Sequence, residues 1–211
     1  MILDPMIEQI KGKNTRIVLT EGEDSRILEA ASRLAQENLL VPVLVGNANN
    51  ISNLANELNL SLEKCELIDI ETYEDFQNMV DEMALLRKGK QTREECEVLL
   101  KMPNYFGTML VKNGMADGLV GGATYSTADT VRPALQLVKT KPESKTVSSA
   151  FLMYNEQQKF MFGDCAIIID PSSEDLCEIA IESAKLGRLF GIDPKVAFLS
   201  YSTKSPLSGS K

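Results

Sequence analysis

Short apolar runs alternate with segments of helical periodicity along the first part of the chain. The runs at 16–20, 41–45 and 66–70 have the length and composition of buried strands. Between them, 24–35 repeats apolar residues at helical spacing behind the cap Asp24, and 47–58 is expected to be a polar helix. Strands that alternate with helices are typical of a parallel sheet with right-handed crossover connections. The pattern therefore predicts an α/β fold.

Further helices are expected before and after this alternation. Their signals are a proline at a first helical position, amphipathic spacing and a capping box. These signals place helices at 4–11, at 71–86, from Thr92 and from Pro103.

The pattern changes beyond a polar, proline-bearing linker at 140–145. Alternating strands and helices precede this linker, and two strand-like runs follow it directly. We therefore expect an α/β domain over residues 1–145 and the first part of a second domain over 146–211.

The second part of the chain has a pattern of its own. Two apolar runs, 146–155 and 159–169, are joined by a polar turn and predict an antiparallel hairpin. A well-capped helix is expected over 171–190, and one more strand over 195–201.

A glycine-rich stretch at 117–136 is the best candidate for a ligand site. An apolar run ends there in Gly121 and Gly122, and capping side chains precede an apolar-periodic segment. This order is typical of a strand, a tight turn and a helix N-terminus. Glycines let the backbone approach a ligand, and the first N–H groups of a helix can bind an anion.

Pro133 and Arg132 bear on where this helix begins. Because proline is tolerated near a helix start, we expect the helix proper to begin near Thr130. Arg132 would then lie in the first turn, where the dipole disfavours a cation unless an anion shares the site. Alternatively, Ser126 and Asp129 are ordinary N-caps and Arg132 is solvated. The residues alone leave both interpretations open, and no dinucleotide or nucleoside triphosphate fingerprint is present.

Composition excludes several classes of function. The 211-residue chain has 22 Lys and Arg against 30 Asp and Glu, which gives a net charge of −8. This balance argues against nucleic acid or an anionic membrane as the main partner. The absence of histidine removes Ser-His-Asp and Cys-His catalysis and histidine zinc sites. Any chemistry must use carboxylates, hydroxyls, thiols, lysine or arginine.

The cysteines and apolar runs bear on the compartment. The four cysteines show neither metal-site nor disulfide spacing, and no signal peptide opens the chain. The apolar runs are far shorter than the ~20 residues that cross a bilayer. A cytoplasmic protein without a membrane segment is expected.

The glycine-rich stretch resembles the signature region of the phosphate acetyl/butyryl transferase family, most closely that of the phosphate acetyltransferases. Other segments agree with this family in order along the chain, at 21–30, 87–90, 104–111, 164–166 and 199–204. The resemblance implies a three-layer α/β/α domain with a mostly parallel sheet, like that of the isocitrate and isopropylmalate dehydrogenases. It also implies a partial second α/β domain.

The resemblance also implies an activity, the reversible transfer of an acetyl group between acetyl phosphate and coenzyme A. The CoA thiolate would attack the acetyl carbonyl directly. Coenzyme A is then a substrate, no tightly bound cofactor or metal is expected, and the second domain would form a homodimer. A phosphate butyryltransferase and a catalytically silent fragment that binds CoA or phosphate stay open as alternatives. A metal-dependent dehydrogenase is a distant alternative, weakened by the missing nucleotide fingerprint.

Position by position, the resemblance assigns phosphate or CoA recognition to Arg87, Arg132, Arg26, Ser126, Thr127 and Thr130. It places Cys165 near the CoA site, although a buried strand cysteine explains that residue equally well. The family's catalytic base and Ser/Arg pair belong to a C-terminal segment that we expect this chain to lack. No catalytic residue is therefore assigned, and Asp129 is well explained as a cap.

Overall fold

The structure is a computed structural model that describes residues 4–142 and 144–199. It divides into two units, Met1–Lys139 and Thr140–Lys211, which we describe separately. The domain limits 1–145 and 146–211 stay a prediction beside this division. Within the described ranges, no helix is both long and apolar enough to cross a membrane.

Unit 1 is built on a four-stranded parallel sheet. Its strands are β1 (Arg16–Leu19), β2 (Val41–Val45), β3 (Glu66–Ile68) and β4 (Gly118–Val120), in the order β3-β2-β1-β4. All three pairings are parallel, and Val18 lies opposite both Val43 and Leu119. The parallel α/β sheet expected from the alternating pattern is confirmed.

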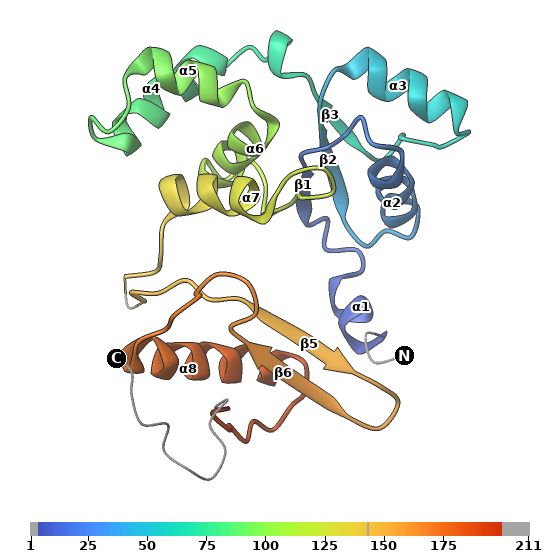
Figure 1. Ribbon diagram of the computed structural model, residues 1–211. Coiled ribbons are helices and arrows are strands. Elements are labelled where there is room, and N and C mark those ends of the chain that lie inside the picture. Colours follow the sequence, from blue (N-terminus) through green and yellow to red (C-terminus); the bar gives the residue numbers. More distant parts are fainter. Residues whose placement is uncertain (1–3, 143, 200–211) are drawn as a thin grey trace. The chain divides into compact units, whose positions relative to one another are not determined.

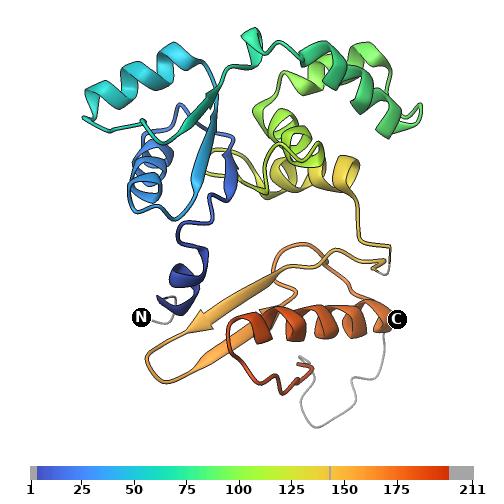
Figure 2. The same cartoon turned by 180° about the vertical axis from the view of Figure 1, so that it is seen from behind.

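Helices cover both faces of this sheet (Figures 1 and 2). One face carries α2 (Ser25–Gln36) and α3 (Ala48–Glu57). The other carries the helices α4 (Phe76–Arg87), α5 (Arg93–Leu100), α6 (Pro103–Lys112) and α7 (Thr127–Pro133). A short helix α1 (Asp4–Ile10) precedes β1. The three-layer α/β/α arrangement implied by the resemblance is therefore confirmed.

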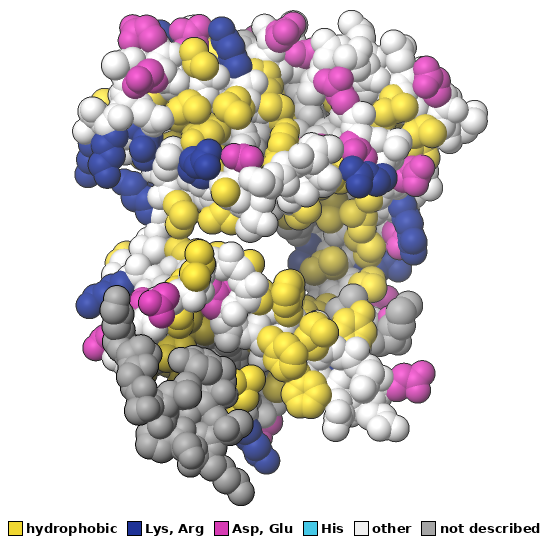
Figure 3. Space-filling model, in the orientation of Figure 1, with side chains coloured by type: hydrophobic (Ala, Val, Ile, Leu, Met, Phe, Trp, Pro, Cys, Tyr) yellow, Lys and Arg dark blue, Asp and Glu magenta, His cyan; other side chains and the backbone are white. Residues whose placement is uncertain are grey.

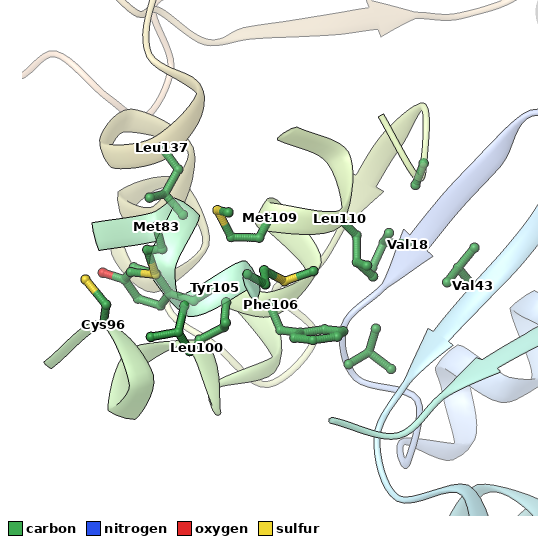
Figure 4. Packing of buried hydrophobic residues seen from close by; sticks show 14 residues of the cluster. Val18, Val43, Met83, Cys96, Leu100, Tyr105, Phe106, Met109, Leu110 and Leu137 are labelled. Atoms are coloured by element: carbon green, nitrogen blue, oxygen red, sulfur yellow. The ribbon is translucent and has the colours of Figure 1, made fainter. Parts of the chain in front are cut away.

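Successive side chains of each strand point to opposite faces of the sheet, and they contribute to an apolar cluster on each face. Val18 and Val43 face the larger cluster, in which α6 supplies the fully buried Phe106 (Figure 4). Leu19 and Leu44, the next residue of each strand, face α2 and α3. A strand that is buried on both faces has a continuous apolar sequence, so these strands could be predicted well.

Two helix starts in unit 1 differ from expectation. The helix expected over 71–86 begins at Phe76, because Asp69 caps a separate 3-10 turn, Ile70–Thr72, and Tyr73 then takes an extended conformation. The helix expected to begin near Thr130 begins at Thr127.

Unit 2 contains an antiparallel hairpin and a long helix. The strands β5 (Ala150–Tyr154) and β6 (Lys159–Gly163) pair as expected, although each is shorter than its apolar run. Helix α8 (Ser173–Leu189) begins with a capping box between Ser172 and Asp175 and lies against β6. Close approach is possible because Gly163 has no Cβ, which would lie 2.3 Å from Ser183 Oγ.

The strand expected over 195–201 is not present in its described part, 195–199. Val196, Phe198 and Leu199 are exposed there, with no neighbouring strand to supply hydrogen-bond partners. Residues 200–211 lie outside the described ranges, as does most of the last segment of resemblance, 199–204.

Candidate functional site

The glycine-rich turn lies where two neighbouring strands end. Because β1 and β4 are parallel, Glu21 after β1 and Gly121 after β4 emerge at the same edge of the sheet. A Cβ on Gly121 would lie 2.6 Å from Thr20 Oγ1, and Gly122 has a φ of +106°. Side chains are excluded at the first position and strained at the second, so both glycines are needed for this turn.

The carboxylate of Glu21 accepts hydrogen bonds from this turn. Its Oε2 accepts the backbone N–H groups of Gly122 at 2.9 Å and Ala123 at 3.1 Å. Its Oε1 accepts the backbone N–H of Thr124 and the Thr124 hydroxyl, the latter at 2.7 Å. Successive N–H groups that converge on one point form an anion-binding nest, and here the anion belongs to the chain itself.

Glu21 is only 7% exposed, yet its charged form is favoured. Burial alone would raise the pKa of Glu21, but the hydrogen bonds from Thr124, Ala123 and Gly122 outweigh burial and lower it. The side chain is therefore a permanent anion at neutral pH.

Helix α7 starts directly after the turn, with Ser126 as its N-cap. The Ser126 hydroxyl accepts the N–H of Asp129 at 3.2 Å and donates to Asp129 Oδ2 at 2.6 Å. Thr127 is the first helical residue, and the Thr130 hydroxyl donates to the Ser126 carbonyl at 3.2 Å.

Arg132 does not lie in the first turn of α7, contrary to expectation. The helix begins at Thr127, so Arg132 falls in its last turn, where a cation is favoured by the dipole. Its Nη1 lies 3.3 Å from Asp129 Oδ1, and the side chain is half exposed. The argument for an anion from an unfavourable dipole therefore fails.

Pro133 lies inside α7 and not near its start. A proline cannot donate the usual helical N–H bond. The chain continues as a π-helix, Ala134–Val138, whose wider turn closes with the Lys139 N–H donating to the Ala134 carbonyl at 2.9 Å.

Arg87, the last residue of α4, reaches this π-helix. Its Nη1 donates to the Gln136 carbonyl at 3.2 Å, and its Nε donates to Gln91 Oε1 at 2.5 Å. The side chain of Gln136 is fixed in turn, because Tyr105 donates its hydroxyl to Gln136 Oε1 at 3.0 Å. Both acceptors of Arg87 are neutral, and no carboxylate among the described residues forms an ion pair with it.

Arg87 and Arg132 lie close to the same buried phenol. Burial raises the pKa of Tyr105, and the positive charges of Arg132 and Arg87 oppose that rise. Two arginines from different helices therefore act electrostatically on the same phenol, and Arg87 also contacts the π-helix directly.

Arg26 lies on the other side of the turn. Its guanidinium makes two hydrogen bonds to Asp24, at 2.9 and 2.7 Å, and Nη2 also donates to the Ala123 carbonyl at 3.3 Å. The hydrogen bonds from Arg26 lower the pKa of Asp24 to about 2. Arg26 thus carries its own counter-ion, whereas Arg87 does not.

Cys165 belongs to unit 2 and lies beside a second bound carboxylate. Its Sγ is 3.2 Å from the Ser149 hydroxyl, which donates to Asp164 Oδ1. Asp164 also accepts the N–H groups of Ser149, Ala166, Ile167 and Ile168. Burial would raise the pKa of Asp164, but these hydrogen bonds hold it well below its usual range. Such a carboxylate is a poor proton acceptor.

Three residues of this region were not expected from the sequence: Glu21, Tyr105 and Gln136. Their partners are far away along the chain, Glu21 by more than a hundred residues, so no local spacing marks them. Only the position of Glu21 directly after a buried strand was a signal. In the described ranges, no group of three Cys, Asp or Glu side chains is placed to hold a metal ion.

Comparison with known proteins identifies the family. A family model described as "Phosphate acetyl/butaryl transferase" matches residues 1–211. The chain belongs to this family. It is 51% identical over 197 residues to the phosphate acetyltransferase of Bacillus subtilis (strain 168), covering 93% of this chain and 61% of that protein. It is 48% identical over 203 residues to the phosphate acetyltransferase of Staphylococcus epidermidis (strain ATCC 12228), covering 96% and 62%.

Solved members of the phosphate acetyl/butyryl transferase family share the fold. The EutD phosphotransacetylase from Staphylococcus aureus superposes with a TM-score of 0.87 at 48% identity, over 96% of this chain and 62% of that one. A phosphotransacetylase from Streptococcus pyogenes gives 0.92 at 45% identity, over 100% and 64%. The chain thus spans about three fifths of the curated relatives' length.

Proposed function

We propose that this chain is the phosphate-recognising part of a phosphate acetyltransferase, which transfers an acetyl group reversibly between acetyl phosphate and coenzyme A. Membership of the family supports the reaction class, and the curated relatives named phosphate acetyltransferase support acetyl over butyryl. Coenzyme A acts as a substrate, without a tightly bound cofactor.

One observation carries this proposal: Arg87 is held by neutral acceptors and keeps its full charge for an external anion. An arginine fixed by hydrogen bonds but left without a counter-ion is suited to bidentate binding of a phosphoryl group. Arg132 supplies a second cation near the same phenol. Ser126, Thr127 and Thr130 carry hydroxyl groups at the start of α7, of which those of Ser126 and Thr130 already donate to Asp129 Oδ2 and to the Ser126 carbonyl.

The reaction needs positive charge at the leaving group. The CoA sulfur forms a bond to the acetyl carbon, the bond between that carbon and the phosphate oxygen breaks, and inorganic phosphate leaves with the electron pair. Arg87 and Arg132 stabilise the charge that develops on the departing phosphate. Asp129 and Asp164 are both engaged in hydrogen bonds, so we assign neither as the base for the thiol. We propose Arg26 and Cys165 as CoA contacts, on the resemblance alone.

We also propose a compartment and an assembly for this protein. The cysteines of the described residues are free thiols, as in a reducing compartment, which supports the cytoplasm. A homodimer through residues of unit 2 is supported by the exposed apolar face of its hairpin, which carries Phe151, Met153, Phe160 and Phe162.

The test is thioester formation by the 211-residue chain with CoA and acetyl phosphate, with butyryl phosphate in parallel. Any turnover should be acetyl-specific, and the affinity for inorganic phosphate should fall about 10- to 100-fold in Arg132→Ala and Arg87→Ala, since each loses a charge-assisted contact to phosphate. Arg93→Ala is the matched control, because Arg93 pairs with Asp81 on α4 and has no place in the site.

Calorimetric titration with inorganic phosphate separates binding from chemistry. Phosphate binding without turnover, lost in Arg132→Ala, would support a recognition fragment whose catalytic groups lie elsewhere. Equal turnover on butyryl phosphate would favour the butyryl enzyme. The absence of phosphate binding in the unmodified chain would contradict the proposal.

A further inference from the structure

The amide nest of the glycine-rich turn already holds an anion. The two carboxylate oxygens of Glu21 take three consecutive backbone N–H groups and one hydroxyl, all from residues 122–124. In phosphate-binding loops of similar build, such N–H groups are left for the ligand. Here the strand next to β4 supplies the acceptor.

We propose that Glu21 is a positioning residue that occupies this nest permanently, fixes the start of α7, and directs a phosphate ligand to the arginine side of that helix. The last part rests on the function proposed above. The first two parts concern the chain itself and stand without it.

Two features keep a second anion out of the nest: the charge of Glu21 and the lack of unused N–H donors. Glu21 is nearly fully buried and ionised, so a phosphate at the same N–H groups would lie against a fixed negative charge in a site of low dielectric. It would also find the donors of residues 122–124 already engaged. The two acceptors of Arg87 are neutral, and Arg132 contacts Asp129 through Nη1 alone, so each guanidinium keeps N–H groups for a ligand.

The positioning role follows from the short path to α7. Thr124, which donates twice to Glu21, is two residues before the N-cap Ser126. On its other side, α7 is held by the side chain of Asn104, whose Nδ2 donates to the Asp129 carbonyl at 2.7 Å. Anchors at both sides set the direction in which Arg132 leaves the helix.

The first experiment needs no variant. In the 15N-labelled chain, the amide protons of Gly122, Ala123 and Thr124 are expected downfield, because they bond to a carboxylate. Inorganic phosphate should leave these three resonances in place and shift those around Arg132 and Arg87. A saturable shift of Gly122, Ala123 and Thr124 by phosphate would overturn the proposal.

The second experiment removes the carboxylate and returns it. Glu21→Ala vacates the nest, and formate, which carries the same carboxylate, should refill it and raise the thermal midpoint by about 2–4 °C. The matched control is Glu23→Ala, since Glu23 also accepts two hydrogen bonds, from Asn47 N and Asn50 Nδ2, but at the start of α3. The proposal would be contradicted if formate did not raise the thermal midpoint of Glu21→Ala, or if it raised that of Glu23→Ala equally.

Glu21→Gln serves where Glu21→Ala does not fold. It keeps the size of the side chain, loses the charge and turns an NH₂ group toward donors, so the three amide resonances should move upfield. Unchanged resonances would count against the carboxylate as their acceptor.

The third experiment measures the rate of acetyl transfer. Misplacement of Arg132 by the loss of Glu21 should lower kcat/KM for acetyl transfer by about 100-fold, with partial recovery in formate. If the unmodified chain does not bind phosphate but shows the expected resonances and formate effect, the proposed function is wrong and the role of Glu21 stands. Normal turnover in Glu21→Ala, unaffected by formate, removes the role and leaves the function.

Discussion

Two carboxylates, Glu21 and Asp164, organise turns in this molecule by accepting hydrogen bonds from several groups at once. Three of the N–H donors of Asp164 lie two to four residues further along the chain, so a local capping role could have been inferred from the sequence. The donors of Glu21 come from the turn that follows β4, and only the pairing of β1 with β4 brings them near. The difference explains why Glu21 was missed.

The role of the arginines could not be predicted from local sequence either. The resemblance assigned Arg87 and Arg132 by position, and the residues alone could not, because cations at helix ends are common. What distinguishes Arg87 is its neutral surroundings, a property of the packed helices and not of its neighbours in sequence. Its role in phosphate binding stays a prediction.

Asp164→Asn should destabilise unit 2 by about 1–3 kcal/mol at pH 7, because charge-assisted hydrogen bonds are lost. The folded-state pKa of Asp164 is lowered, so its contribution is fully present above the unfolded pKa of ~4 and is lost as pH falls below that value. Urea unfolding of both proteins at pH 7 and near pH 3 should show the difference shrinking in acid. Asp170→Asn, an exposed carboxylate in the same loop, should have little effect at either pH, and an equal effect would contradict the prediction.

Helices with local start signals were placed well. Asp24, Thr92 and Ser172 each cap the helix that the sequence assigned to them, since a cap bonds only to the next few residues. Asn47 caps the helix expected over 47–58. The starts of α4 and α7 were misplaced, because a 3-10 turn and an interior proline break the local rules. The strand over 195–201 failed because a strand needs a partner, and apolar runs do not report one.

Helix α6 depends on the absence of a side chain at Gly107. A Cβ there would lie 2.9 Å from Val18 Cγ1 and Thr20 Cγ2 and 3.0 Å from Leu119 Cδ1, all on the sheet. Gly107→Ala should therefore lower the free energy of unfolding by about 1–3 kcal/mol, although alanine is the better helix former. Chemical denaturation followed by circular dichroism measures the change.

Gly187→Ala in α8 is the matched control for this substitution. A Cβ at Gly187 would meet Ile192 no closer than 3.7 Å, which is ordinary contact. Here helix propensity should prevail, with a gain of up to ~1 kcal/mol. The same sign for both variants would show that packing against the sheet does not decide the outcome at Gly107.

At the scale of the whole molecule, one face of the hairpin in unit 2 carries exposed apolar side chains. Phe151 lies opposite Phe162, and Met153 opposite Phe160, and all four side chains are 48–57% exposed. Figure 3 shows hydrophobic side chains gathered over this hairpin. Apolar side chains that gather on one exposed face are typical of a surface that binds another protein.

The proposed homodimer makes a prediction for this face. Phe160→Glu should weaken self-association at least about 10-fold, because it places a charge in a desolvated contact. Sedimentation equilibrium of the chain and the variant measures the dissociation constant. Tyr154→Glu is the control, since Tyr154 is similarly exposed on the opposite face of the hairpin. A monomeric unmodified chain, or equal weakening by both variants, would contradict a dimer through this face.

The strand order of unit 1 also sets the sequence of events during synthesis. Glu21 leaves the ribosome 103 residues before Thr124, roughly 5–20 s at ordinary rates of translation. During that interval β1 can pair with β2 but not with β4, so one of its edges is open and the carboxylate is hydrated. Glu21 is thus among the first residues of the unit to be made, and its hydrogen bonds are among the last to form.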